Sequence, residues 1–322
     1  MSRFWRSVIA STIALSFHWS TTVSAQTVPS QTSRMFAPYV DMSKLANGLP
    51  QIQAASGLKT LTLAFIVSGS PCVPAWGGTA PISADTTIAD GIAKLRAAGG
   101  DVSIAFGGYD GIDLGQSCAG PASLQAAYQA VIDKYKVTIL DFDVEHTAIE
   151  DPVSIDRRNQ TLKALAAVNP GLQINYTLPA TPAGLTDLSL NVIKSAVKYG
   201  TPVSIVNLMA MDYGAPVPNG AMGPDAVAAA SAAACQLKSL GLNARIGITP
   251  MIGVNDSAGE TFALDDAQVV LNYALANDNV VGLLAFWSVG RDNGSCSGAV
   301  SPTCSGIPQK DWDFTRIFQK FQ

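Results

Sequence analysis

The chain has 322 residues, of which 48% are hydrophobic and 14% are charged, and its formal net charge is −4. That length can bury a large core, either as one large α/β barrel or as two domains. The acidic balance and the lack of any Lys/Arg cluster exclude a nucleic-acid partner, because such a surface would repel phosphates.

The first 25 residues have the pattern of an export signal. Arg3 and Arg6 form a short basic region, residues 8–17 form an apolar one, and small residues up to Ala25 supply a cleavage site. The apolar run is too short to span a bilayer, and no later stretch is long enough. We therefore expect a secreted protein, extracellular or periplasmic, with no membrane partner.

Strand-like and helix-like segments alternate through the rest of the chain. The expected strands cover residues 36–40, 61–67, 101–106, 137–146, 172–178, 202–211, 245–251 and 280–287. The expected helices cover residues 44–56, 86–98, 123–135, 158–168, 188–199, 225–240, 265–276 and 312–321. Near-continuous apolar strands that alternate with helices indicate a parallel sheet buried on both faces. Eight such units predict an α/β fold, a single-domain (β/α)8 TIM barrel over residues 35–322, preceded by a polar linker at residues 26–34.

Five cysteines in a chain with an export signal indicate disulfides. Cys296 and Cys304 are close together in a Gly/Ser/Pro-rich stretch, which favours a local loop closure. Cys72 and Cys118 follow two predicted strands and are candidates for a second pair, whereas Cys235 is expected to be a small buried residue of a helix. No Cys–His spacing suits a metal, and only one histidine follows the signal. We therefore expect no metal, no other cofactor, and no Ser–His or Cys–His catalysis.

The stretch at residues 137–146 carries carboxylates at every second position: Asp141, Asp143 and Glu145. Side chains alternate across a strand, so the three acids share one face with neighbours about 6.5–7 Å apart, and His146 is expected on the other face without a chemical role. Burial and like charge raise carboxyl pKa values. Such carboxylates suit acid catalysis at neutral pH, and Glu145, the outermost, is the candidate acid. A solvated strand face and a calcium site are the alternatives.

Other strand ends carry residues that suit a ligand site, because active sites of such barrels lie at the carboxyl ends of the strands. Asp212 and Tyr213 follow the predicted sixth strand, with a plain turn as the alternative. Trp287 ends the eighth strand, where its flat ring would face a ligand. Gly107 and Gly108 follow the third strand and would let a ligand approach the backbone closely.

Further residues are candidates for lining the same groove. Met209 and Met211 either fill the core or floor a sugar pocket. Tyr176 lies on the predicted fifth strand and is a candidate contact. Trp76 and Tyr109 lie in predicted loops, where they either line a groove or serve the surface alone.

With these residues placed, the chain resembles glycoside hydrolase family 18, the chitinases and their relatives. The family pattern D-x-x-D-x-D-x-E occurs here as Thr138-Ile-Leu-Asp-Phe-Asp-Val-Glu145, with Thr138 replacing the first acid. Further matches are Ala37-Pro-Tyr-Val-Asp41, Phe106-Gly-Gly108, Asn207-Leu-Met-Ala-Met-Asp-Tyr-Gly214, Ile248-Thr-Pro-Met-Ile-Gly253 and Ala285-Phe-Trp287. The Met-Asp-Tyr-Gly form is similar to a bacterial and archaeal branch of the family.

The resemblance implies retaining hydrolysis of β-1,4 linkages between N-acetylglucosamine units by substrate assistance. Glu145 would protonate the leaving oxygen while the acetamido oxygen of the sugar attacks the anomeric carbon, giving an oxazolinium ion. Asp143 would orient the acetamido nitrogen, with Asp141 behind it. Tyr213, with or without Asp212, would hold the acetamido group, because the common order Met-x-Tyr-Asp is Met-x-Met-Asp-Tyr here.

The resemblance also implies a partner, namely chitin or N-acetylglucosamine oligosaccharides, and we expect the secreted chain to be a monomer. Trp287 would floor the sugar site by stacking on the apolar face of the ring. Two alternatives stay open: a non-catalytic chitin-oligosaccharide-binding protein, and an endo-β-N-acetylglucosaminidase acting on glycoprotein glycans. The presence of Glu145 argues against the first, whereas the second uses the same acids.

Overall fold

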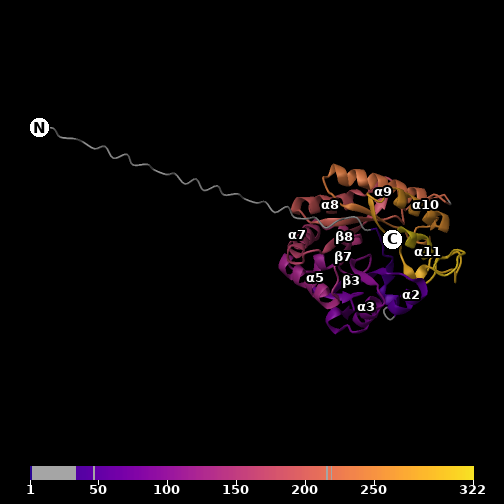
Figure 1. Cartoon of the computed structure of the whole chain (residues 1–322), viewed down its shortest axis with the longest axis horizontal. Coiled ribbons are helices and arrows are strands. Elements are labelled where there is room, and N and C mark those ends of the chain that lie inside the picture. Colours follow the sequence, from indigo (N-terminus) through magenta and orange to yellow (C-terminus); the bar gives the residue numbers. More distant parts are fainter. Residues whose placement is uncertain (2–33, 46–47, 215–216, 219) are drawn as a thin grey trace. The chain divides into compact units, whose positions relative to one another are not determined.

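The computed structural model describes Met1 and residues 34–322, except 46–47, 215–216 and 219 (Figure 1). Apart from Met1 and Arg34, the predicted export signal and the predicted linker lie outside the described residues. Among the helices that are described, none is long and apolar enough to cross a membrane.

Parallel strands pair in a closed ring over the described part of the chain. The ring contains β3 (Thr60–Ser70), β6 (Asp101–Gly107), β7 (Ile139–Asp143), β8 (Gln173–Thr181), β10 (Val203–Met209), β11 (Arg245–Thr249) and β14 (Val281–Leu284). The first strand segment closes the ring, because β1 (Met35–Phe36) pairs with β14 and β2 (Tyr39–Asp41) pairs with β3, both in parallel. The predicted TIM barrel is confirmed.

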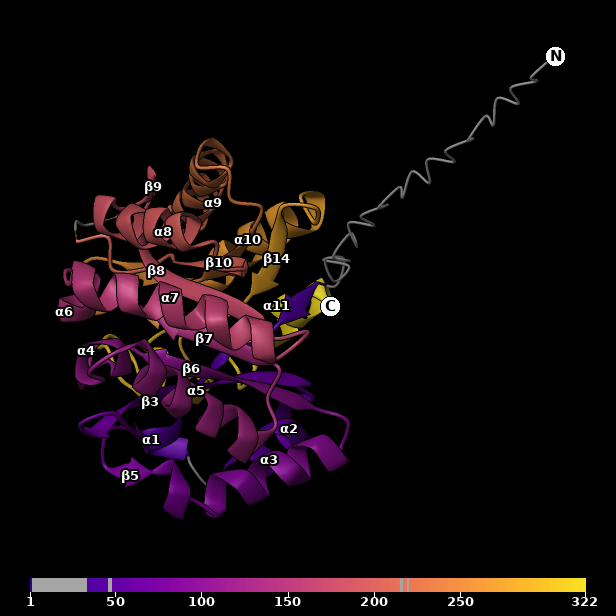
Figure 2. The same cartoon turned by 90° about the vertical axis from the view of Figure 1, so that its left-hand side faces the viewer.

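Helices lie between successive strands and cover the outside of the ring (Figure 2). They are α2 (Leu49–Ser56), α3 (Thr87–Ala97), α5 (Pro121–Tyr135), α7 (Pro152–Val168), α8 (Asp187–Tyr199), α9 (Met222–Ser239), α10 (Leu264–Ala276) and α11 (Asp313–Phe318). Helix α7 begins six residues before the predicted start. Asp151 accepts a hydrogen bond from the Val153 amide (3.0 Å) and Pro152 occupies the first turn, which is a favourable helix start.

Short helices, strands and 3-10 turns lie within the loops. They are α1 (Met42–Leu45), α4 (Leu114–Ser117), α6 (His146–Ile149), β4 (Val73–Trp76), β5 (Ala80–Pro81), β9 (Gly184–Leu185), β12 (Gly253–Val254), β13 (Thr261–Phe262), η1 (Ile82–Ala84), η2 (Val289–Arg291) and η3 (Gln319–Phe321). Strands β12 and β13 form a separate antiparallel pair beyond β11.

Two apolar layers lie on opposite faces of the ring. The larger one packs outward-facing strand residues against the helices; in it Phe142 stacks on Phe106 with ring centroids 5.1 Å apart, and Tyr128 of α5 meets both rings edge-on. The smaller one lies inside the ring and consists of Ala37, Tyr39, Ala64, Ala105, Ile205, Leu283 and Ala285. Because several of its members are alanines, the interior has room for polar side chains beside them.

The disulfide predictions are confirmed. Cys72 bonds to Cys118 across two loops, and Cys296 bonds to Cys304 within one loop. The prediction for Cys235 is wrong: its side chain is exposed on α9, because the alanines at 226, 229, 230 and 233 supply the buried face of that helix instead.

Trp76 does not line a groove, which corrects another expectation. It lies on β4, it is 5% exposed, and its indole nitrogen donates to the Tyr135 hydroxyl over 2.8 Å. The hydroxyl in turn donates to Asp85 over 2.9 Å. Trp76 therefore anchors the β4 hairpin onto α5.

Candidate active site

The acid stretch forms a column that rises along the inner face of β7. Asp141 and Asp143 are 2% and 5% exposed, and Glu145 is partly exposed above them. Strand β7 ends at Asp143, earlier than predicted, but Glu145 keeps an extended backbone (φ −141°, ψ −174°) as the cap of α6. The alternation therefore continues through Glu145 and keeps it on the same face.

His146 breaks the alternation and corrects its predicted place. Its φ of 49° is left-handed, so the chain turns into α6 instead of continuing as a strand. The exposed imidazole stacks on Tyr109, with ring centroids 4.7 Å apart and planes 25° apart. Tyr109 is 65% exposed, so the pair forms an open aromatic surface next to Glu145.

The deepest acid is bound by neighbours from two other strands. The Tyr39 hydroxyl on β2 donates to Asp141 Oδ2 over 2.7 Å, and the Thr177 hydroxyl on β8 donates to Asp141 Oδ1 over 2.8 Å. Asn207 on β10 donates to both hydroxyls, over 3.2 Å and 3.0 Å. Thr249 on β11 then donates to Asn207 Oδ1 over 2.9 Å. A polar network inside the barrel thus fixes Asp141.

Burial raises the pKa values of all three acids. It raises the pKa of Asp141 to about 6, against the hydrogen bonds from Tyr39 and Thr177, which lower it. The pKa of Asp143 is also raised, first by burial and then by the charges of Glu145 and Asp141, and its Oδ1 is buried without a hydrogen-bond partner. Burial raises the pKa of Glu145 to about 7. At neutral pH the outermost acid can therefore still hold a proton.

Two further carboxylates act on Glu145. Asp110 and then Asp212 raise its pKa by their negative charge, after burial. Asp110 lies in the loop after β6, next to Tyr109. The sequence analysis did not predict it, because a loop has no periodic pattern that indicates which side chains face the site. The loop is tied down by the Cys72–Cys118 disulfide and by a buried ion pair between Arg158 and Asp113 (2.5 Å).

The structure places Asp212 and Tyr213 differently. Asp212 has a left-handed φ of 51°, and its Oδ1 accepts a hydrogen bond from the Ser257 amide over 2.7 Å. Its negative charge raises the pKa of Glu145. Tyr213 packs against the outer apolar layer, and its buried hydroxyl has no partner. The charges that raise the pKa of that hydroxyl, after burial, are Asp225 and Glu260, not the acid column.

Two aromatic rings lie together at the mouth. Trp287 stacks on Phe65, with centroids 5.6 Å apart and planes 18° apart, and Tyr39 lies beneath Trp287 at 6.2 Å. Both stacked rings are partly exposed. Phe65 was not predicted, because strict alternation along β3 does not hold: the pairing with β6 shifts register between Leu63 and Ile66.

Of the remaining predicted contacts, the two methionines are partly exposed, whereas Gly107 and Tyr176 are buried against other parts of the protein. Met209 shares the inner face of β10 with Asn207, and Met211 follows the strand; both are partly exposed. Gly107 has a φ of 88°, and a Cβ there would lie 2.0 Å from the Asp143 carbonyl oxygen, so the close approach of β7 by itself requires glycine at this position. Tyr176 faces the helices: it is fully buried and donates to Asn159 over 2.8 Å, which differs from the predicted substrate contact.

Among the residues that the structure describes, no group of three or more His, Cys, Asp or Glu side chains is arranged to hold a metal ion. The deepest acid of the column accepts hydrogen bonds from two hydroxyls, and two stacked aromatic rings lie at the mouth. The arrangement can deliver a proton to a group that stacks on Trp287, and it can stabilise positive charge below that group.

Comparison with known proteins finds chitinases. No family model matches the chain. It is 34% identical over 313 residues to a probable bifunctional chitinase/lysozyme of Escherichia coli (89% of this chain, 34% of that protein). It is 34% identical over 282 residues to endochitinase 11 of Metarhizium anisopliae (80% of this chain, 52% of that protein). The chain thus spans about a third and about half the length of these two relatives.

A solved structure matches over nearly its whole length. The catalytic domain of the hyperthermophilic chitinase from Pyrococcus furiosus superimposes with a TM-score of 0.81 at 36% identity, covering 90% of this chain and 95% of that one. The barrel fold and these similarities identify a glycoside hydrolase. The chain belongs to glycoside hydrolase family 18, the chitinase family.

Proposed function

We propose that this protein is a chitinase, which hydrolyses β-1,4 linkages between N-acetylglucosamine units with retention, by substrate-assisted catalysis. One observation carries the proposal: Glu145 stands partly exposed on top of two buried aspartates, with its pKa raised to about 7. The names of the relatives support it, and the Pyrococcus furiosus domain has been solved with chito-oligosaccharides.

In the first step, Glu145 donates its proton to the glycosidic oxygen as the bond to the leaving sugar breaks. The acetamido oxygen of the retained sugar attacks the anomeric carbon from the other face and forms an oxazolinium ion. Asp143 accepts from the acetamido N–H through its unpartnered Oδ1, and Asp141 supports the positive charge from below. A water then attacks the anomeric carbon, with Glu145 as the base.

Asp212 is our candidate for the second contact to the acetamido group, and Tyr213 is not. The charge of Asp212 reaches Glu145, whereas the Tyr213 ring packs against the outer layer. The Trp287 ring, backed by Phe65, floors the sugar. Met209 and Met211 line the wall near Asp212.

Secretion and a monomeric state are also part of the proposal. The two disulfides support an oxidising compartment, because such bonds persist outside the cytosol. The signal pattern before residue 26 supports export.

The proposal is tested with Glu145→Gln, which keeps the size of the side chain and removes the transferable proton. We expect hydrolysis of soluble chitin oligomers to be lost, while oligomer binding, followed by tryptophan fluorescence, changes by less than about threefold. Glu150→Gln is a matched control, because Glu150 is an exposed glutamate at the end of α6. Full activity of the Glu145 variant contradicts the assignment.

A second assay separates the alternatives. Wild-type protein is incubated with colloidal chitin and, separately, with a glycoprotein that carries N-linked glycans. Oligomers from chitin support the proposal, released glycans point to an endo-β-N-acetylglucosaminidase, and binding without any product points to a lectin-like protein.

A further inference from the structure

Glu260 is a buried carboxylate that serves no step of the proposed mechanism. It is 1% exposed, and among the described residues no Lys, Arg or His forms an ion pair with it. Its two oxygens accept hydrogen bonds from successive backbone amides, Tyr213 N and Gly214 N, each over 3.0 Å. A buried charge is costly to leave without such partners, so these bonds tie the carboxylate firmly to the turn after β10.

The turn after β10 and the loop between β12 and β13, which carries Glu260, are joined by a second carboxylate, this time from the turn. Asp212, directly before that turn, accepts from the Ser257 amide over 2.7 Å, and the Glu260 amide donates to the Ser257 carbonyl over 3.2 Å. Each loop thus offers one carboxylate to backbone amides of the other. We call these reciprocal carboxylate–amide hydrogen bonds the clamp. They hold Asp212 in a left-handed conformation (φ 51°) that is unfavourable for a residue with a side chain.

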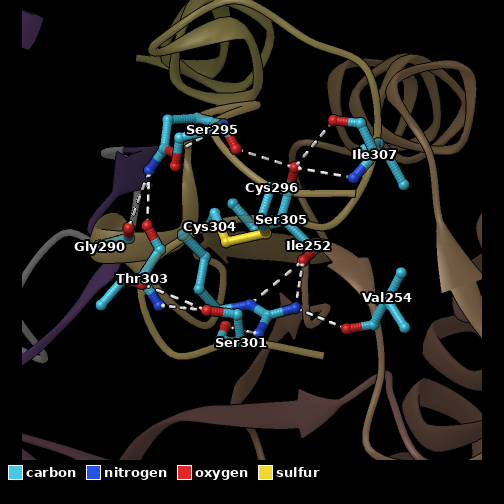
Figure 3. The surroundings of a disulfide bond; sticks show 12 residues. Ile252, Val254, Gly290, Ser295, Cys296, Ser301, Thr303, Cys304, Ser305 and Ile307 are labelled. Carbon is cyan, nitrogen blue, oxygen red and sulfur yellow. Dashed lines mark hydrogen bonds between the residues drawn. A yellow bond between two sulfur atoms is a disulfide. The ribbon is translucent and has the colours of Figure 1, made fainter. Parts of the chain in front are cut away.

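The loop that carries Glu260 is itself held from behind by Arg291. The 1% exposed guanidinium of Arg291 donates to the carbonyls of Ile252 (2.9 Å), Val254 (2.5 Å) and Ser301. Figure 3 shows these carbonyls gathered around one guanidinium beside the Cys296–Cys304 disulfide. Through Arg291, the disulfide loop is therefore connected to residues 252–254, which lead into the loop that carries Glu260.

We propose that Glu260 is a positioning residue, whose carboxylate holds the turn at residues 212–214 so that Asp212 faces Glu145. This inference rests on the proposed function, since it concerns the same acid. Glu260 acts on the reaction through Asp212 alone. When the clamp is lost, Asp212 moves away from Glu145 and its negative charge no longer helps Glu145 to retain a proton.

The test is Glu260→Gln, assayed on soluble chitin oligomers across a range of pH. The amide keeps one acceptor and places N–H donors against the second backbone amide, so the turn relaxes. We expect kcat to fall roughly ten- to hundredfold with little change in KM, as for a small misplacement of a catalytic group. We also expect the basic limb of the kcat profile to move to lower pH, in the same direction as for Asp212→Asn.

A double variant distinguishes positioning from general destabilisation. If Glu260 acts through Asp212, the Glu260→Gln/Asp212→Asn protein has the limb of Asp212→Asn alone, without a further shift. Additive shifts, or a lower melting temperature with an unchanged limb, overturn the inference. Glu260→Asp keeps the charge on a shorter side chain and should recover part of the lost kcat, whereas the exposed control Glu150→Gln should match wild type.

Failure of folding and failure of the proposed function have different signatures. If Glu260→Gln does not fold, the pH profile is measured on Glu260→Asp; if neither folds, Glu260 serves the fold and the inference is wrong. A wild-type protein that does not cleave chitin oligomers overturns the proposed function. An active wild type with an unaltered Glu260 variant overturns only the positioning role.

Discussion

The hydroxyl of Tyr39 offers a direct test of how the acid column works. Tyr39→Phe removes one hydrogen bond to Asp141 (2.7 Å) and leaves the ring, which packs inside the barrel against Phe65 and Trp287. Thr177 keeps its own bond to Asp141, and Asn207 keeps its bond to Thr177. The variant therefore changes the charge balance of Asp141 without opening a large cavity.

The size of the effect follows from the burial of the pair. A hydrogen bond to a buried charged group contributes about 1.5–3 kcal/mol, which corresponds to roughly 1–2 pKa units. Because the Tyr39 hydroxyl lowers the pKa of Asp141, which burial holds at about 6, its loss moves that pKa upward. The Asp141 pKa then meets or passes that of Glu145, which is about 7.

The pH profile of kcat/KM shows this change directly, because it reports the acid and the base of the free enzyme. If turnover needs Asp141 ionised and Glu145 protonated, the acidic limb reports Asp141 and the basic limb reports Glu145. With pKa values of about 6 and 7, roughly 60% of the enzyme is active at the optimum, and a rise of the Asp141 pKa by about 1.5 units leaves about 13%. We therefore expect an optimum displaced to higher pH and a maximal kcat/KM about four- to fivefold lower.

Tyr135→Phe is the matched control, because Tyr135 is equally buried but binds Asp85 and Trp76 outside the ring. It should lower the melting temperature and leave both limbs in place. An acidic limb that stays near pH 6 in Tyr39→Phe would refute the link between this hydroxyl and Asp141.

Two more predictions follow from the geometry. Tyr176→Phe removes the hydroxyl that donates to Asn159, so the free energy of unfolding should fall by about 1 kcal/mol while KM for chitin oligomers stays unchanged; a raised KM would return Tyr176 to the binding site. Reducing the disulfides one at a time by paired Cys→Ser changes should cost more for Cys72–Cys118 than for Cys296–Cys304, since their sequence separations are 46 and 8. The chain-entropy relation gives about 4 and about 2.6 kcal/mol, measured by urea unfolding, and a reversed order would contradict it.

The sequence contains enough information for the barrel and for the acid column because both depend on short-range patterns. Alternating apolar strands and helices determine the order of layers, and a period of two places Asp141, Asp143 and Glu145 on one face. Element ends were less accurate. Strand β7 stops at Asp143, and a left-handed residue, His146, ends the alternation.

Other parts of the site depend on contacts that no local pattern reports. Phe65 reaches the mouth through a register shift in β3, and Asp110 reaches Glu145 through a loop held by a disulfide and an ion pair. Tyr39 and Asn207 lie in stretches that matched the family pattern, yet their bonds to Asp141 and Thr177 join strands far apart in sequence. The signal that would have pointed to them is a polar side chain on the inward face of an apolar strand.

The acid column makes the folded protein less stable at neutral pH, and the reason is the one that suits it to catalysis. Asp141 has an ordinary pKa of 3.8 and a folded-state pKa of about 6, so the native state binds its proton more tightly than the unfolded state does. Stability therefore falls as pH rises through that window, by about 3 kcal/mol for this group alone. Burial shifts Asp143 and Glu145 in the same direction. The interactions that oppose ionisation inside the barrel are those that leave a proton on Glu145 near pH 7, so amides in these places would favour folding and remove the acid.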